Sequence, residues 1–186
     1  MRKGEAKAEY RGCKASACLN LDGQGLANVR SGSGFLDHML TAMTRTGLLD
    51  LEARADAGFY RIEALGSVIG QALDRSLADR SGIRRYGSSS VPMDEALANV
   101  ALDFSGRPYL VFNGELASER IGDLEVQLLR PFLEAFCMGA RLTLNVRFSG
   151  ENDHHKVEST FKALGFAIRQ AATKEGLGVP STKGVI

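Results

Sequence analysis

Apolar residues recur every three or four positions in four stretches of the chain and alternate with polar residues in the stretches between them. Helices are therefore expected over 35–47, 62–77, 123–138 and 153–174. Strands are expected over 48–55, 86–93, 96–106, 108–116 and 141–148, with a hairpin around Asp22-Gly23. The Gly- and Pro-punctuated tail after residue 174 is expected to form an ordered loop or a mobile closing segment. The pattern predicts a chain in which short runs of strands alternate with single helices.

The order of these elements is itself repeated along the chain. Superposing Glu63 on Glu158 also aligns two glycines seven residues further on. The pattern stays matched over roughly 45 positions, which indicates a duplicated unit. We predict an α+β fold of two duplicated two-layer α/β halves with mixed sheets, related by a pseudo-twofold axis. The first repeat is expected at residues 1–88, and the second at 89–186 together with the tail.

Composition and charge exclude several classes of protein. Lys plus Arg is 23 and Asp plus Glu is 22, so the net charge is +1, which argues against electrostatic binding of nucleic acid. No apolar run approaches the roughly 20 residues of a membrane span, and no apolar segment follows the basic N-terminus as in a secretory signal. The three cysteines have no metal-like spacing, so reduced thiols and a cytoplasmic location are expected.

Two of the three histidines are adjacent, in the segment DHHKVE that ends at Glu158. Asp153 or the preceding residue suits an N-cap, so His154 and His155 are expected in the first helical turn, with Glu158 on their shared flank. Because successive helical residues diverge by about 100°, the pair would serve two neighbouring metals, or one metal and a second group. Imidazole and carboxylate favour Mn, Fe, Zn or Ni. The alternatives are a solvated helix start whose histidines only cap and, for His38, a half-buried hydrogen-bonded histidine.

Five motifs occur in a fixed order: GFLDHML, IRRYGSSSVPMDEAL, DFSGRPYLVFN, GENDHHKVE and VPSTKG. Together they resemble the imidazoleglycerol-phosphate dehydratase family over nearly the whole chain. The resemblance implies two ribosomal S5 domain 2-like halves. It also implies a lyase of histidine biosynthesis, which dehydrates imidazole-glycerol phosphate to imidazole-acetol phosphate. The family's pattern further implies a homo-oligomer of about 24 subunits, two manganese ions per site, and no nucleic-acid or membrane partner.

The chain departs from the family at the first of its two His-His-x-x-Glu motifs, which reads Phe59-Tyr60-Arg-Ile-Glu63. A phenol titrates near 10 and cannot replace imidazole as a strong ligand at neutral pH. We therefore expect one manganese ion or fewer per subunit, with the pair Phe59-Tyr60 filling the vacated space by apolar packing. By the family's pattern, the glutamates Glu63 and Glu158 are the catalytic residues, and His38 and Glu63 share a metal with one histidine of the second motif. The ligands that remain are His38, Glu63, His154, His155 and Glu158.

The phosphate-binding positions of the family are retained. The resemblance assigns this role to Arg85, Arg107, Ser181 and Lys183. Arginine suits a bidentate grip on phosphate, lysine supplies a point charge and serine adds a hydroxyl donor. The resemblance also places Asp103 and Glu95 near the site, where they would orient these groups.

Two functions remain open at this stage. The first is a dehydratase with an impaired metal site, which acts on a small phosphorylated imidazole. The alternative is a catalytically inactive paralogue that serves as a phosphate-ligand-binding or structural subunit.

Overall fold

The computed structural model describes residues 1–176 and 178–181. The first half of the chain forms β1 (Lys3–Tyr10), β2 (Cys13–Asn20), β3 (Ala27–Arg30), α1 (Gly34–Gly47), β4 (Asp50–Ala55) and α2 (Arg61–Leu77). The second half forms β5 (Tyr86–Met93), β6 (Ala96–Asp103), β7 (Tyr109–Asn113), β8 (Arg120–Ile121), β9 (Leu124–Glu125), a 3-10 turn at Val126–Leu128, α3 (Leu129–Ala140), β10 (Thr143–Ser149) and α4 (Asp153–Ala172). Within the described part of the chain, no helix is both long and apolar enough to cross a membrane.

The two halves have the same sheet topology. The strand orders are β1-β2-β4-β3 and β5-β6-β10-β7. In each sheet the last pair, β3 with β4 or β7 with β10, is parallel and the other pairs are antiparallel. The prediction of duplicated α+β halves with mixed sheets is confirmed.

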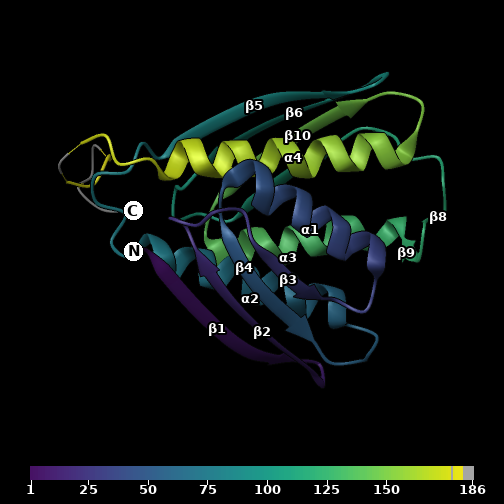
Figure 1. Cartoon of the computed structure of the whole chain (residues 1–186), viewed down its shortest axis with the longest axis horizontal. Coiled ribbons are helices and arrows are strands. Elements are labelled where there is room, and N and C mark those ends of the chain that lie inside the picture. The colour runs from purple at the N-terminus through teal and green to yellow at the C-terminus, as the bar shows by residue number, and fades with distance from the viewer. Residues whose placement is uncertain (177, 182–186) are drawn as a thin grey trace.

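The four helices lie between the two sheets (Figure 1), with α1 packed on α4 and α2 packed on α3. Each of these pairs joins one helix from each half. The sheets bury alternate residues: in β6, Ala96, Ala98, Val100 and Leu102 are buried and the residues between them face outward. Each half therefore completes its core with helices of the other half.

The halves are joined by the segment between α2 and β5. Arg80 anchors this segment and is only 2% exposed. Its guanidinium donates to the carbonyl oxygens of Phe104 and Ala140, both at 3.0 Å, and pairs with Asp74. Because β5 begins at Tyr86, the expected boundary after residue 88 falls inside this strand, and the second sheet starts before it.

The hairpin expected around Asp22-Gly23 lies elsewhere. The antiparallel hairpin joins β1 to β2, and its turn is Arg11-Gly12, where φ is 48° and 81°. Two successive positive φ angles are typical of the tight turns that suit twisted strands. Asp22 instead binds Arg2, and the chain after it leads to β3, which pairs with β4 rather than with β2. The prediction was wrong because a turn dipeptide does not specify which strands it connects.

Asp123 was expected to begin a helix, but α3 starts at Leu129 and Asp123 lies between β8 and β9. Its carboxylate accepts hydrogen bonds from the Ser33 hydroxyl and from the backbone N–H groups of Gly34 and Phe35. These bonds satisfy free donors at the start of α1 and lower the pKa of Asp123 to about 2. A residue of the second half thus fixes the start of α1, the helix that carries His38.

Replacing Asp123 with alanine should lower the free energy of unfolding by about 1 kcal/mol at neutral pH, the usual cost of a lost helix cap. Because the folded-state pKa lies below the ordinary value, this stabilisation is complete above about pH 4 and disappears as the pH falls toward 2. Urea titrations at pH 7 and at about pH 2.5 check this. Asp56→Ala, at an exposed position, is the control. A difference from the unmodified protein that is equally large at both pH values would contradict the assignment.

Candidate metal centre and phosphate site

The start of α4 holds the paired histidines. Asn152 is the N-cap, and its side-chain oxygen accepts from the backbone N–H of His154 at 2.9 Å. The next residue, Asp153, is buried and pairs with Lys156, which also donates to the Glu115 carbonyl at 2.8 Å. As predicted from the sequence, both histidines lie in the first helical turn. The buried ion pair ties this turn to the chain after β7.

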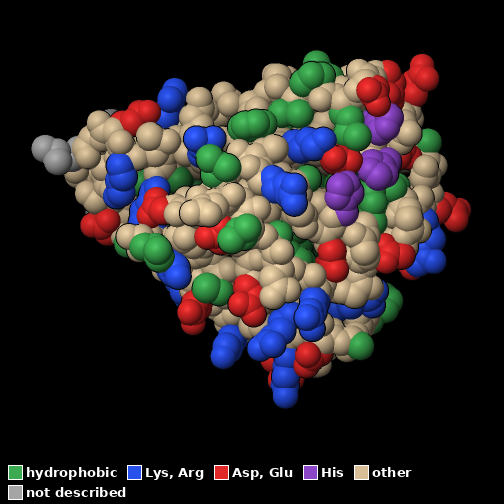
Figure 2. Space-filling model, in the orientation of Figure 1, with side chains coloured by type: hydrophobic (Ala, Val, Ile, Leu, Met, Phe, Trp, Pro, Cys, Tyr) green, Lys and Arg blue, Asp and Glu red, His purple; other side chains and the backbone are tan. Residues whose placement is uncertain are grey.

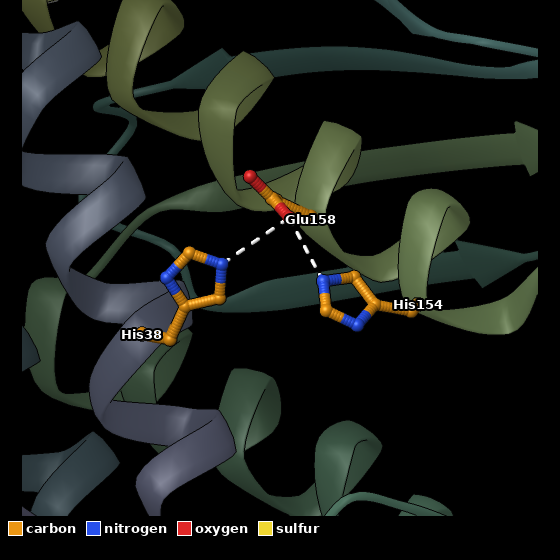
Figure 3. Close-up of side chains that lie close together, drawn as sticks. All are labelled: His38, His154 and Glu158. Carbon is orange, nitrogen blue, oxygen red and sulfur yellow. Dashed lines mark hydrogen bonds and ion pairs between the residues drawn. The ribbon is translucent and has the colours of Figure 1, made fainter.

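His38 of α1 meets His154 and Glu158 of α4 (Figure 3). The Nε2 atoms of His154 and His38 lie 2.9 Å and 3.2 Å from the same oxygen of Glu158, Oε2. The three ligand atoms are within 4.8 Å of one another. The histidines gather near one end of the face seen in Figure 2, beside acidic side chains. We call His38, His154 and Glu158 the histidine–glutamate group.

Glu158 is 7% exposed and is ionised at neutral pH. Burial pushes the pKa of Glu158 upward, but the hydrogen bonds from Lys162 and the two histidines outweigh it and hold that pKa at about 2. Lys162 contacts the other carboxylate oxygen, Oε1, at 2.8 Å. Since an ionised carboxylate only accepts, both histidines donate their Nε2 protons to Oε2 in the metal-free protein.

His155 points away from the histidine–glutamate group. Its ring centre lies 6.1 Å from that of His154, and its Nδ1 lies 2.9 Å from Oε2 of Glu95. The two adjacent imidazoles therefore have different partners, as their divergence along the helix predicts. Glu95 contacts a histidine here, and the role near the phosphate-binding groups that the family resemblance implies for it stays a prediction.

Glu63, on α2, is not part of the histidine–glutamate group as the described residues define it. Its Oε2 is buried without a hydrogen-bond partner among those residues.

Phe59 and Tyr60 do not both fill a cavity as expected. Phe59 is 80% exposed. Tyr60 packs edge-on against Tyr10, and the guanidinium of Arg11 lies 4.7 Å from the centre of its ring. The prediction of apolar packing was wrong for Phe59, because this residue lies in the turn before α2 and faces solvent.

Of the residues expected to bind phosphate, Arg85 lies against the tail of the chain. Arg85 forms a bidentate pair with Asp103 at 2.6 and 3.1 Å, and its Nη1 donates to the Pro180 carbonyl at 2.8 Å. The tail just before Ser181 is thereby held against Arg85. Arg107 is exposed and follows the turn at Gly106. Lys183 lies outside the described residues.

Lys162 was not identified from the sequence, although it lies four residues after Glu158 on the same helix, where side chains of opposite charge meet. That spacing was a usable signal. The contact of Asp123 with α1 had no such signal, since it joins positions 89 residues apart in the chain.

The fold and this site define a duplicated α+β protein with a candidate histidine–carboxylate metal centre. Residues 31–168 match the family model described as imidazoleglycerol-phosphate dehydratase. The chain is 50% identical to the enzyme of that name from Moorella thermoacetica, over 89% of each chain, and 42% identical to that from Methanosarcina barkeri over the full length of both. The chain therefore belongs to the imidazoleglycerol-phosphate dehydratase family.

Solved structures agree with this assignment. The chain superposes on imidazoleglycerol-phosphate dehydratase from Staphylococcus aureus with a TM-score of 0.81 and 35% identity, covering 92% of this chain and 99% of the other. For the Pyrococcus furiosus enzyme, in complex with (S)-C348, the TM-score is 0.84 and the identity 32%, covering 97% and 100%.

Proposed function

We propose that this protein is a cytoplasmic lyase of histidine biosynthesis, which dehydrates imidazole-glycerol phosphate to imidazole-acetol phosphate with an impaired metal site. Membership of the family supports the reaction. The observation that carries the proposal within this chain is the histidine–glutamate group, in which two imidazoles converge on one carboxylate oxygen. A homo-oligomer of about 24 copies is part of the same proposal.

The donor atoms of this group fit a transition-metal ion. Two nitrogens and one oxygen suit manganese, iron or zinc, and three protein ligands leave a position open for substrate. A bound ion would supply a Lewis acid to the imidazole ring of the substrate. We propose manganese, at one ion or fewer per subunit. Glu63 and His155 do not belong to this group. Each would have to bind a metal ion at another position of the site.

Other residues of this chain would orient Glu158 and bind the phosphate group of the substrate. Lys162 holds Oε1 of Glu158, which leaves Oε2 directed at the two imidazoles. Arg107 offers an exposed guanidinium to the phosphate, with Ser181 and Lys183 of the tail as further donors. For Arg85 to join them, its Nη1 would exchange the Pro180 carbonyl for a phosphate oxygen, while Asp103 continues to orient the guanidinium.

His154→Ala and Glu158→Ala should each abolish tight manganese binding. Losing a residue that merely supports a ligand costs roughly 10–100-fold in affinity, so losing a ligand should cost at least as much. Elemental analysis after dialysis and turnover with added Mn²⁺ measure both consequences. Glu134→Gln, on the exposed surface of α3, is the control. Two manganese ions per subunit, retained through dialysis in the unmodified protein, would show the metal site not to be impaired.

The second candidate is a subunit that binds a phosphorylated ligand or supports an assembly without turnover. The replacement of two family histidines by Phe59 and Tyr60 favours it. In that case phosphate should still raise the melting temperature by mass action, and Arg107→Ala should remove the shift. Turnover above background with Mn²⁺ would exclude this candidate.

A further inference from the structure

The two halves each bring a hairpin turn against the start of a helix, but with different chemistry. Arg11 and Asp94 occupy the same turn position, with φ of 48° and 47°. In the first half Arg11 lies on the ring of Tyr60 at the start of α2. In the second half Glu95, next to Asp94, contacts His155 at the start of α4. A phenol and a guanidinium suffice to make this contact, so folding alone does not require the carboxylate–imidazole pair.

Glu95 uses its two oxygens for two separate purposes. Oε1 accepts from the backbone N–H groups of Glu151 and Asn152, at 3.1 and 2.7 Å, and so supports the turn before α4. Oε2 lies 2.9 Å from Nδ1 of His155. Because an ionised carboxylate only accepts, Nδ1 must carry the proton of the neutral ring. The other nitrogen, Nε2, then keeps its lone pair.

His155 differs in this respect from the other two histidines. His38 and His154 direct their Nε2 protons at Glu158, and a metal ion would have to displace these protons. Nε2 of His155 has its nearest carboxylate oxygen, on Asp94, at 3.7 Å, and that side chain is 77% exposed. A metal-ligating histidine almost always donates its second N–H to a carboxylate, a carbonyl or water, and Glu95 provides that arrangement in advance.

We propose that Glu95 is a positioning residue, which fixes the Nδ1–H tautomer of His155 and thereby presents Nε2 as an open ligand atom for a divalent transition-metal ion beside the histidine–glutamate group. The metal-binding part rests on the proposed function. The tautomer does not, because it follows from contacts within the metal-free chain.

Glu95→Gln separates the two roles of this side chain. The glutamine carbonyl can still accept from the two backbone N–H groups, whereas its amide NH₂ can only donate to Nδ1 of His155. The expected result is an inverted tautomer, Nε2–H, with little change in melting temperature. ¹⁵N NMR of the ring nitrogens in the metal-free full-length protein, at about pH 8 and above the ordinary titration range of imidazoles, measures it. Asp94→Asn is the matched control. It should leave the tautomer of His155 unchanged, because the contact between Glu95 and Nδ1 stays in place. Asparagine also tolerates the positive φ of this position.

The second measurement is Mn²⁺ binding by calorimetry. Glu95→Gln should weaken it by about tenfold, the lower end of the range for a residue that supports a ligand. A tautomer that Glu95→Gln does not change, or an Nδ1 without a proton in the unmodified protein, overturns the positioning role. An unchanged dissociation constant overturns the ligand role of His155. If the unmodified protein binds no Mn²⁺, the proposed function fails, and the tautomer measured without metal still decides the role of Glu95.

Discussion

Replacing Gly70 or Gly165 with alanine is expected to destabilise the protein by about 3 kcal/mol or more, the upper range for overpacking a core. A methyl carbon at Gly70, on α2, would lie closer than 3.0 Å to the Phe136 carbonyl oxygen of α3, and one at Gly165, on α4, equally close to the Met43 carbonyl oxygen of α1. In both places the obstacle is backbone. Neither helix pair can accept the methyl group without moving apart.

Thermal and urea unfolding measure this effect, with a melting temperature lower by roughly 6–12 °C for each variant. Gly176→Ala is the control, because a methyl carbon there would have no atom of the described residues within 4 Å apart from its chain neighbours, and its φ is not positive. That variant should be unchanged or slightly more stable. If Gly70→Ala and Gly165→Ala melted like the control, the close approach of the helices described above would be incorrect.

Lys156→Met should cost about 3–5 kcal/mol, because it leaves the buried carboxylate of Asp153 without its partner. Lys156 and Asp153 are 5% and 6% exposed, and their side chains lie 2.5 Å apart. Burial pushes the pKa of Asp153 upward, but the bonds to Lys156 and Ser118 outweigh it and lower that pKa. Without the ammonium group, the cost of burying the charge remains.

The double variant Lys156→Met with Asp153→Asn should be more stable than Lys156→Met alone, since no charge is then buried and the asparagine oxygen can still accept from the Ser118 N–H. Arg130→Met is the comparison at an exposed ion pair, Arg130–Glu134, and should cost less than about 1 kcal/mol. Urea unfolding of all three variants measures these differences in the free energy of unfolding. A double variant no more stable than the single one would mean that the lysine contributes through packing alone.

The bounds of α1 and α2 and the duplication could be predicted from the sequence because they depend on regular spacing along the chain, whereas the start of α3 could not. The apolar stripe of α2 ends at Leu77, as the spacing indicates, and α1 ends at Gly47. The position of the first hairpin could not be predicted in this way. Asp22-Gly23 and Arg11-Gly12 are both acceptable turn dipeptides, and only the pairing of β2 with β1 and β4 distinguishes them.

The candidate site was predictable where its members share one helix. The spacing of His154, His155 and Glu158 placed the imidazoles in different directions, as the structure has them. The partner of each imidazole could not be predicted from spacing, because His38 and Glu95 come from other elements, brought into place by helix packing and by a hairpin turn. The exposure of Phe59 could not be predicted from the neighbouring sequence either, since it depends on where the turn before α2 lies in the folded chain.

The anchored segment around Arg80 determines where the chain could be opened to change the order of its two repeats. The end of α4 lies beside the start of β1, where the Arg2 guanidinium donates to the Ala172 carbonyl, so a linker could join the tail after α4 to β1 while new ends are opened between the repeats. Such a circular permutant would present the second repeat first. The new ends must leave Arg80 attached to α2 and leave Gly82, which bonds to Glu175 and Gly178, attached to β5. The peptide bonds on either side of Ser81 are therefore the places to open this chain.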